Sequence, residues 1–87
     1  MTKAELDSEK QLQPEEIGRL PERTGRARVI GEDRPNGRFA VVISYWHDSL
    51  RRREVLLADA SEDEVTELIT QIEDAYRQAG QTLLVEW

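Results

Sequence analysis

The chain has 87 residues, no cysteine, eighteen acidic and twelve basic side chains, and a net charge of −6. This length suits one small domain, and the lack of cysteine excludes disulfides and thiolate zinc sites. The sequence contains no run of about 18 apolar residues, which a membrane span needs, and no basic-then-apolar secretory signal. We therefore expect a cytoplasmic protein.

Charge is divided unevenly along the chain. Residues 1–18 carry two lysines and five acids, residues 19–53 carry nine arginines and four acids, and residues 54–87 carry one arginine and nine acids. The overall acidity disfavours non-specific affinity for nucleic acid, whereas a local arginine-rich surface suits an anionic partner.

Residues 1–24 are predicted to be a polar N-terminal arm, disordered or docked on a partner. Few apolar side chains are available there to offset the entropy cost of ordering the chain. A brief helical turn is expected to begin at Pro14, because proline is tolerated at the first position of a helix. Gly18 and Pro21 should end that turn quickly. Residues 25–87 are then the single folded domain.

Two segments rich in β-branched and aromatic residues, 26–31 and 38–46, are predicted to be strands. Residues 34–37 between them contain Pro, Asn and Gly, which are typical of turns. A three-residue loop ending in a left-handed Gly37, which forms a bulge, is one interpretation. A two-residue turn is the other.

Strand register distinguishes these loops, because a slip of one residue exchanges the two faces of a strand. The three-residue loop matches apolar residues with apolar residues, so we expect it. By the same reasoning a third strand, about 51–58, follows a loop of odd length around Asp48 and Ser49. The expected pairs are Val29–Ile43 and Ala27–Tyr45 between the first two strands, and Ile43–Val55 and Val41–Leu57 between the second and third.

Residues 61–79 are predicted to form an amphipathic helix, because apolar side chains recur at spacings of three and four. Ser61 and Glu64 have the spacing of a capping box, and Gly80 suits the left-handed residue after a helix end. Residues 82–87 are expected to be a short final strand. The apolar stripe consists of Val65, Leu68, Ile69, Ile72, Tyr76 and Ala79.

The predicted fold is α+β in the order β-β-β-α-β: a three-stranded antiparallel meander, one amphipathic helix packed on one face and a short C-terminal strand. The edge that the last strand joins is left open. One helix cannot cover both faces of a sheet, so the outer face should be uncovered. Its expected rows are Glu32–Ala40–Ala58, Ile30–Val42–Leu56, Arg28–Ser44–Glu54 and Arg26–Trp46–Arg52.

This outer face is the predicted binding surface. Large exposed apolar patches often mark interaction sites, and Trp and Arg are favoured at interface centres. The alternative is that Arg26 and Arg52 only stack on Trp46 and shield it from water. The predicted contact residues are Trp46, Arg26, Arg52, Arg28, Ile30, Val42 and Leu56.

Catalytic residues, a metal site and cofactors are not expected. His47 is the single histidine and has only a turn neighbour, Asp48, rather than the positioned partner that general acid–base catalysis needs. The serines lack a nucleophile setting, and no glycine-rich phosphate loop is present.

We therefore expect a small non-catalytic protein-interaction module, such as an adaptor, regulator or inhibitor subunit. It would act through the open sheet face or a strand edge, on another protein or on a second copy of itself in a homodimer. A nucleic-acid-binding protein that uses the Arg and Trp side chains of the sheet is the first alternative. The second is an inhibitor that mimics nucleic acid with the acidic helix face, formed by Glu62, Asp63, Glu64, Glu67, Glu73 and Asp74.

Overall fold

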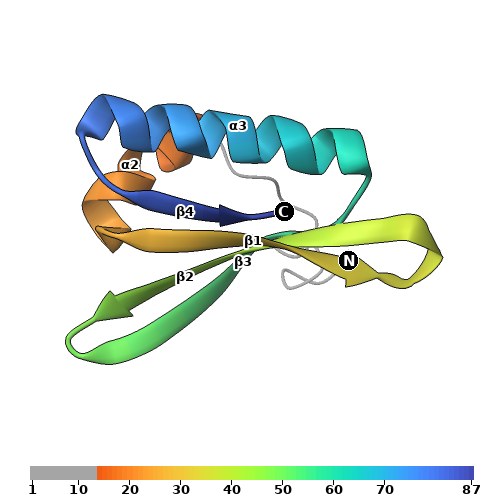
Figure 1. The fold of residues 1–87 in the computed structure, drawn as a ribbon, viewed down its shortest axis with the longest axis horizontal. Coiled ribbons are helices and arrows are strands. Elements are labelled where there is room, and N and C mark those ends of the chain that lie inside the picture. Colours follow the sequence, from red (N-terminus) through yellow and green to blue (C-terminus); the bar gives the residue numbers. More distant parts are fainter. Residues whose placement is uncertain (1–13) are drawn as a thin grey trace, which may run out of the picture.

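Two helices lie on one side of a four-stranded sheet in the computed structural model, which describes residues 14–87 (Figure 1). The strand order is β3-β2-β1-β4, with β4 parallel to β1 and the other pairs antiparallel. The predicted α+β fold is confirmed, and the last strand joins the β1 edge. The elements are α2 (Pro14–Thr24), β1 (Ala27–Arg34), the 3₁₀ turn η1 (Pro35–Gly37), β2 (Arg38–His47), β3 (Leu50–Ala60), α3 (Glu62–Ala79) and β4 (Leu83–Glu86).

The β1–β2 hairpin has the predicted register. Val29 lies opposite Ile43, and the last pair, Arg34 with Arg38, leaves a loop of three residues. Gly37 has a φ of 69°, in the left-handed region that glycine adopts without steric cost. The matching of apolar residues across the strands therefore selected the correct loop.

The predicted register between β2 and β3 is correct in one part of the ladder and wrong in the other. Val41 pairs with Leu57 as expected, but Ile43 pairs with Glu54 and not with Val55. The two strands are joined by a two-residue turn, which has even length. The loop of odd length predicted at this point is wrong.

A bulge in β3 reconciles the two parts of this ladder. The Asp48–Ser49 turn has positive φ at both residues, 53° and 67°, as a type I′ two-residue hairpin requires. Further along, Leu56 is the additional residue between the partners of Val41 and Val42. The bulge turns Leu56 into the core and leaves Val55 half exposed on the outer face, the reverse of the predicted assignment.

Helix α2 continues through Gly18 and Pro21, so the prediction that these residues end it is wrong. Its buried side chains, which include Leu20, pack against α3 and the sheet. The helix ends at Gly25, which has a φ of 64° and whose N–H donates to the carbonyl of Pro21 at 2.9 Å. Residues 14–24 of the predicted arm thus pack on the domain, and residues 1–13 lie outside the described residues.

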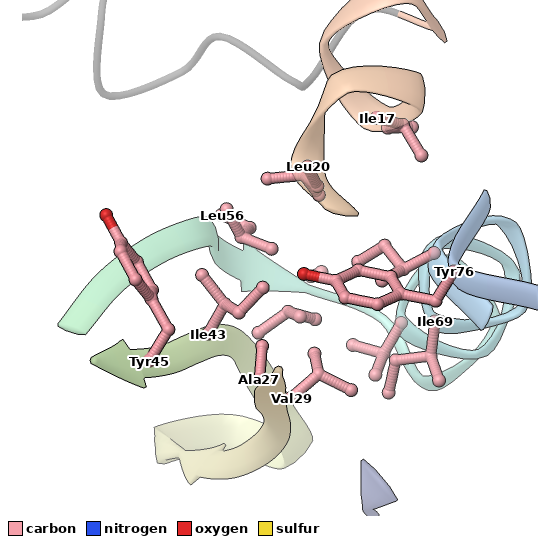
Figure 2. Packing of buried hydrophobic residues seen from close by; sticks show 13 residues of the cluster. Ile17, Leu20, Ala27, Val29, Ile43, Tyr45, Leu56, Ile69 and Tyr76 are labelled. Carbon is pink, nitrogen blue, oxygen red and sulfur yellow. The ribbon is translucent and has the colours of Figure 1, made fainter. Parts of the chain in front are cut away.

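The core fills the space between the inner sheet face and the two helices (Figure 2). The predicted capping box of α3 is present, with Ser61 Oγ accepting from the Glu64 N–H at 3.2 Å, and Gly80 is left-handed as predicted. No helix within residues 14–87 is long and apolar enough to cross a membrane. The main core residues are Ile17 and Leu20 from α2, Val65, Ile69, Ile72 and Tyr76 from α3, and Ala27, Val29, Val41, Ile43 and Leu56 from the sheet.

Candidate interaction surface

The outer face of the sheet is the side that faces away from α2 and α3 (Figure 1). Trp46 stands on this face with 65% of its surface exposed. It lies at the end of β2, where Arg51 is its partner on β3. The predicted outward position of the tryptophan is confirmed, but its flanking arginine on β3 is not Arg52.

The centre of the outer face is shielded rather than open. Val42, a predicted contact residue, is fully buried although it lies outside the core cluster. Arg53 on β3 forms a 2.6 Å ion pair with Glu32 on β1. These two residues align with Ser44 and Ala40, the outer-face positions on either side of Val42. The ion pair therefore spans β2 above Val42 and withholds it from direct contact with a partner.

A cleft of about 420 Å³ opens at one end of this face, where β1 begins and β2 ends. Three arginines and Trp46 line the cleft, which we therefore call the Arg–Trp cleft. None of its lining residues within 14–87 is acidic. The lining consists of Thr24, Gly25, Arg26, Ala27, Arg28, Ser44, Tyr45, Trp46, Arg51 and Leu84.

The three arginines of the cleft are only partly neutralised. Arg28 Nε lies 3.5 Å from a carboxylate oxygen of Glu86 on β4. Arg51 Nε donates to Ser44 Oγ at 3.0 Å, a contact that positions the guanidinium without cancelling its charge. Arg26 forms no hydrogen bond or ion pair with any residue from 14 to 87. One carboxylate against three guanidinium groups leaves the cleft positive and attractive to anions.

A second network, on the helix side of the same hairpin, fixes the strand that carries Trp46. Two guanidinium nitrogens of Arg23 on α2 donate to the two carboxylate oxygens of Glu54 at 2.6 and 3.1 Å. The Tyr45 hydroxyl also donates to Glu54. Forked pairs of this kind hold both partners in a defined geometry. Because Tyr45 precedes Trp46, the network anchors the end of β2 beneath the cleft.

The same contacts shift the ionisation of their members. Hydrogen bonding from Arg23, and then from Tyr45, lowers the pKa of Glu54 below its ordinary value. The hydrogen bond to Glu54 raises the pKa of Arg23 and likewise that of Tyr45, whose neutral hydroxyl is the donor. The network is therefore charged at Arg23 and Glu54 and neutral at Tyr45 near pH 7.

The structure gathers only part of the predicted contact set. Trp46, Arg26 and Arg28 meet at the Arg–Trp cleft, and Ile30 lies half-buried in the middle of the outer face. Two predicted members are elsewhere: Leu56 is in the core, and Arg52 pairs with Tyr45 on the helix side of the sheet. The predicted outer-face positions of Arg52 and Leu56 are therefore wrong.

Arg51, Ser44 and Leu84 also line the cleft but were not in the predicted contact set, although Ser44 was expected beside Arg28 on the outer face. Reading Asp48–Ser49 as a two-residue turn would have paired His47 with Leu50 and therefore placed Arg51 beside Trp46. Leu84 could not be placed without the parallel pairing of β4 with β1.

The described part of the chain has no cluster of metal-binding side chains. Residues 14–87 contain no group of three or more acidic or histidine side chains placed to hold an ion. His47 Nε2 lies 3.3 Å from Asp48 Oδ2 in an exposed turn. No family model, no curated protein and no solved structure matches the chain.

Proposed function

We propose that this chain is a protein-binding module that docks an acidic segment of a partner protein on the outer sheet face, with the Arg–Trp cleft as the anchor. The observation that carries the proposal is the grouping of three arginines around an exposed tryptophan. Tryptophan and arginine dominate the energetics of protein interfaces. Arginine forks also bind carboxylates through two parallel hydrogen bonds, which gives orientation as well as attraction.

The openness of the surface favours a macromolecule over a small ligand. Small-molecule sites are concave and bury most of the ligand, whereas Trp46 is mostly exposed at the cleft. A flat sheet face with one anchoring cleft suits a peptide segment that lies across the strands. The shielding Arg53–Glu32 pair would then form part of the polar surround of the interface.

Single-stranded nucleic acid is the second candidate, favoured by the same combination of Trp46 and arginines. An aromatic ring can stack on a base while guanidinium groups contact phosphates. The net charge of −6 opposes a long polyanion beyond the few contacts at the cleft. An acidic peptide is repelled less, because it is shorter than a nucleic acid and carries fewer charges along its length. Protein binding therefore ranks first.

The acidic face of α3 gains less support as a nucleic-acid mimic. Glu64 closes the capping box with the Ser61 N–H at 2.9 Å, and Asp74 pairs with Arg77. Two of the six carboxylates are thus engaged within the helix itself.

Affinity capture from the native host, with wild type and two variants of the full chain as bait, tests the proposal. Wild type and Leu50→Ala should retain the same partner protein, and Trp46→Ala should lose it. Leu50 is the matched control, because it is also a large exposed apolar residue but lies at the hairpin turn outside the cleft. Equal capture by Trp46→Ala, with circular dichroism showing all three folded, would overturn the proposal.

A labelled single-stranded oligonucleotide, titrated at several salt concentrations, separates the second candidate from the first. Protein binding as the main function predicts weak or no oligonucleotide binding near physiological salt. Tight binding that falls steeply with salt and disappears in Trp46→Ala would place nucleic acid first, because counterion release produces that dependence.

A further inference from the structure

The two edges of the sheet are built very differently within residues 14–87. The β3 edge carries the consecutive residues Arg51, Arg52 and Arg53 and two register irregularities against β2. Charged side chains and bulges are the features that prevent an edge strand from pairing with another chain. The β4 edge has an uninterrupted register with β1 over Leu83–Glu86 and contains no proline, glycine or lysine.

The unprotected β4 edge is also the most apolar exposed part of the described chain. Of the six large exposed apolar side chains in residues 14–87, three lie here: Leu84 is 51% exposed, Val85 38% and Trp87 49%. Its one charged residue, Glu86, already contacts Arg28. An exposed apolar edge whose single charge is already paired within the chain can accept another strand.

The pairing with β1 determines which backbone groups of β4 remain free. The Ala27 N–H donates to the Thr82 carbonyl at 3.4 Å, and Ala27 aligns with Leu83. Backbone groups of successive residues point to opposite edges of a strand, so residues 82, 84 and 86 face β1. The N–H and carbonyl groups of Leu83 and Val85 therefore point away from β1, toward the open edge.

We propose that this edge pairs antiparallel with β4 of a second copy of the chain, with Val85 opposite Val85 of that copy. In an antiparallel ladder the residues that exchange hydrogen bonds lie directly opposite each other. Only registers that oppose Leu83, Val85 or Trp87 to one another use the free groups. The register centred on Val85 is the one that engages the whole strand.

In this register the residues of β4 are complementary to those of a second β4, so the partner strand is β4 of a second copy. On the helix side, Val85 lies opposite Val85 and Leu83 lies opposite Trp87, whose ring packs on Gly31 and Phe39 of its own chain, so only apolar residues are opposed. On the outer face Leu84 meets Glu86, and no pair of like charges is opposed. Two-fold dimers are the commonest protein assemblies, and a small core with no cysteine gains stability from association.

The dimer would be one eight-stranded sheet with a two-fold axis at Val85. Leu84 belongs to both the seam and the Arg–Trp cleft, so the two clefts would flank the seam. A partner with two acidic segments could then engage both clefts at once, with the gain in avidity that linkage provides. The dimer does not depend on the proposed function, because its edge contacts are independent of what the cleft binds.

Sedimentation velocity on the full chain tests the association. Wild type should sediment at about twice the 10.1 kDa of one chain. Val85→Lys and Val85→Pro should each lose the dimer at concentrations where wild type is fully dimeric. Neither removes a backbone bond to β1, because the Val85 N–H faces the open edge. Val55→Lys is the control, since Val55 is 50% exposed on the opposite edge strand.

Single cysteines introduced into this cysteine-free chain test the register. Residues directly opposite in a hydrogen-bonded antiparallel pair have Cα atoms about 5.5 Å apart, within disulfide range. Val85→Cys should therefore form a covalent dimer on mild oxidation. Leu84→Cys, although more exposed, should not, because Leu84 opposes Glu86 and not its own copy.

Three outcomes would overturn this proposal. If wild type stays monomeric at high micromolar concentration, the proposed dimer does not form. If the dimer persists in both Val85 variants, β4 is not the interface. If Leu84→Cys cross-links as readily as Val85→Cys, the register centred on Val85 is wrong. Loss of partner capture by Trp46→Ala in a chain that remains dimeric affects neither result, so this proposal and the proposed function fail separately.

Discussion

The indole ring of Trp87 lies directly on the backbone of Gly31, so close that a β-carbon at position 31 would overlap the ring. Trp87 also meets Phe39 edge to face, with ring centroids 4.9 Å apart and an interplanar angle of 84°. The glycine has no positive φ. It is required by the close approach of the ring, as is common for glycine within strands.

Replacing Gly31 with alanine should therefore displace Trp87 and destabilise the fold by about 1–2 kcal/mol. The cost stays moderate because the ring is half exposed and can swing outward, losing mainly its aromatic pair. Tryptophan fluorescence during urea unfolding measures this best in a Trp46→Phe background, where Trp87 is the only emitter. Unchanged emission and stability would show that the ring does not rest on Gly31 in solution.

The matched substitution Gly18→Ala should act in the opposite direction. Gly18 is exposed in the middle of α2, and a β-carbon there meets nothing within 4 Å. Alanine restricts the unfolded chain and favours helix, which is worth about 0.5–1 kcal/mol. Urea unfolding should show a higher midpoint than in wild type. A lower midpoint would indicate that α2 is not helical at this position.

Thr24 and Tyr76 join α2 to α3 through a buried hydrogen bond between their hydroxyl groups. Thr24 Oγ1 also donates to the Leu20 carbonyl at 2.7 Å. Burial raises the pKa of the Tyr76 hydroxyl, which favours its neutral, donating form. The threonine hydroxyl is thus satisfied twice, whereas the tyrosine hydroxyl depends on threonine.

Thr24→Val should consequently cost more than Tyr76→Phe. The first leaves a buried hydroxyl without its partner, at about 1–3 kcal/mol, and the second removes one ordinary hydrogen bond, at about 0.5–1.5 kcal/mol. The double variant should cost less than the two single effects added together, because the second substitution removes the stranded group. Strict additivity of the three unfolding free energies would argue against the contact.

The β1–β2 hairpin and α3 could be predicted because their signals are local. Matching Val29 with Ile43 identifies the loop, and Ser61 and Gly80 mark the two ends of the helix. Each signal involves residues adjacent along the chain or along one hairpin, so no knowledge of the remaining structure was needed.

The β3 register could not be predicted in the same way. Val55, Leu56 and Leu57 are three consecutive apolar residues, and alternation does not tell which of them is the additional one. The burial of Leu56 in the core cluster decides it. The position of this additional residue determines whether Arg51 or Arg52 lies beside Trp46. The wrong register therefore placed Arg52 instead of Arg51 in the predicted site.

Helix α2 begins at Pro14 as predicted, but its length could not be predicted for a related reason. Gly18 and Pro21 both disfavour helix when read locally, and only packing outweighs them. Ile17, Leu20 and Pro21 are buried against the rest of the domain. The second half of α2 thus depends on tertiary contacts that its local sequence pattern does not reveal.

The ion pair between Arg23 and Glu54 predicts a dependence of stability on pH. The pKa of Glu54 is lower in the folded chain than in the unfolded one, so its contribution is fully present above the unfolded pKa of about 4.3. That contribution is lost as the pH falls through the folded pKa. Both side chains are more than a third exposed, so screening limits the contribution to about 1 kcal/mol or less.

Unfolding of wild type and Glu54→Gln at pH 7, 5 and 3 measures this contribution. Wild type should be the more stable of the two at pH 7 and at pH 5, and the difference should shrink toward pH 3. A difference that grows on acidification would have the wrong sign for a stabilised carboxylate.

Arg51 and Arg52 are adjacent residues with the same charge, and the register makes them a matched pair for testing the cleft. Arg51 lines it beside Trp46, whereas Arg52 pairs with Tyr45 on the helix side. Arg51→Ala should weaken binding of the captured partner about tenfold, the range for one charged hydrogen bond, and Arg52→Ala should weaken it little. Calorimetric titration in about 0.3 M salt removes the long-range charge effect that both substitutions share. If Arg52→Ala weakened binding as much as Arg51→Ala, the net charge of the hairpin would be what attracts the partner, and the geometry of the cleft would have no part in recognition.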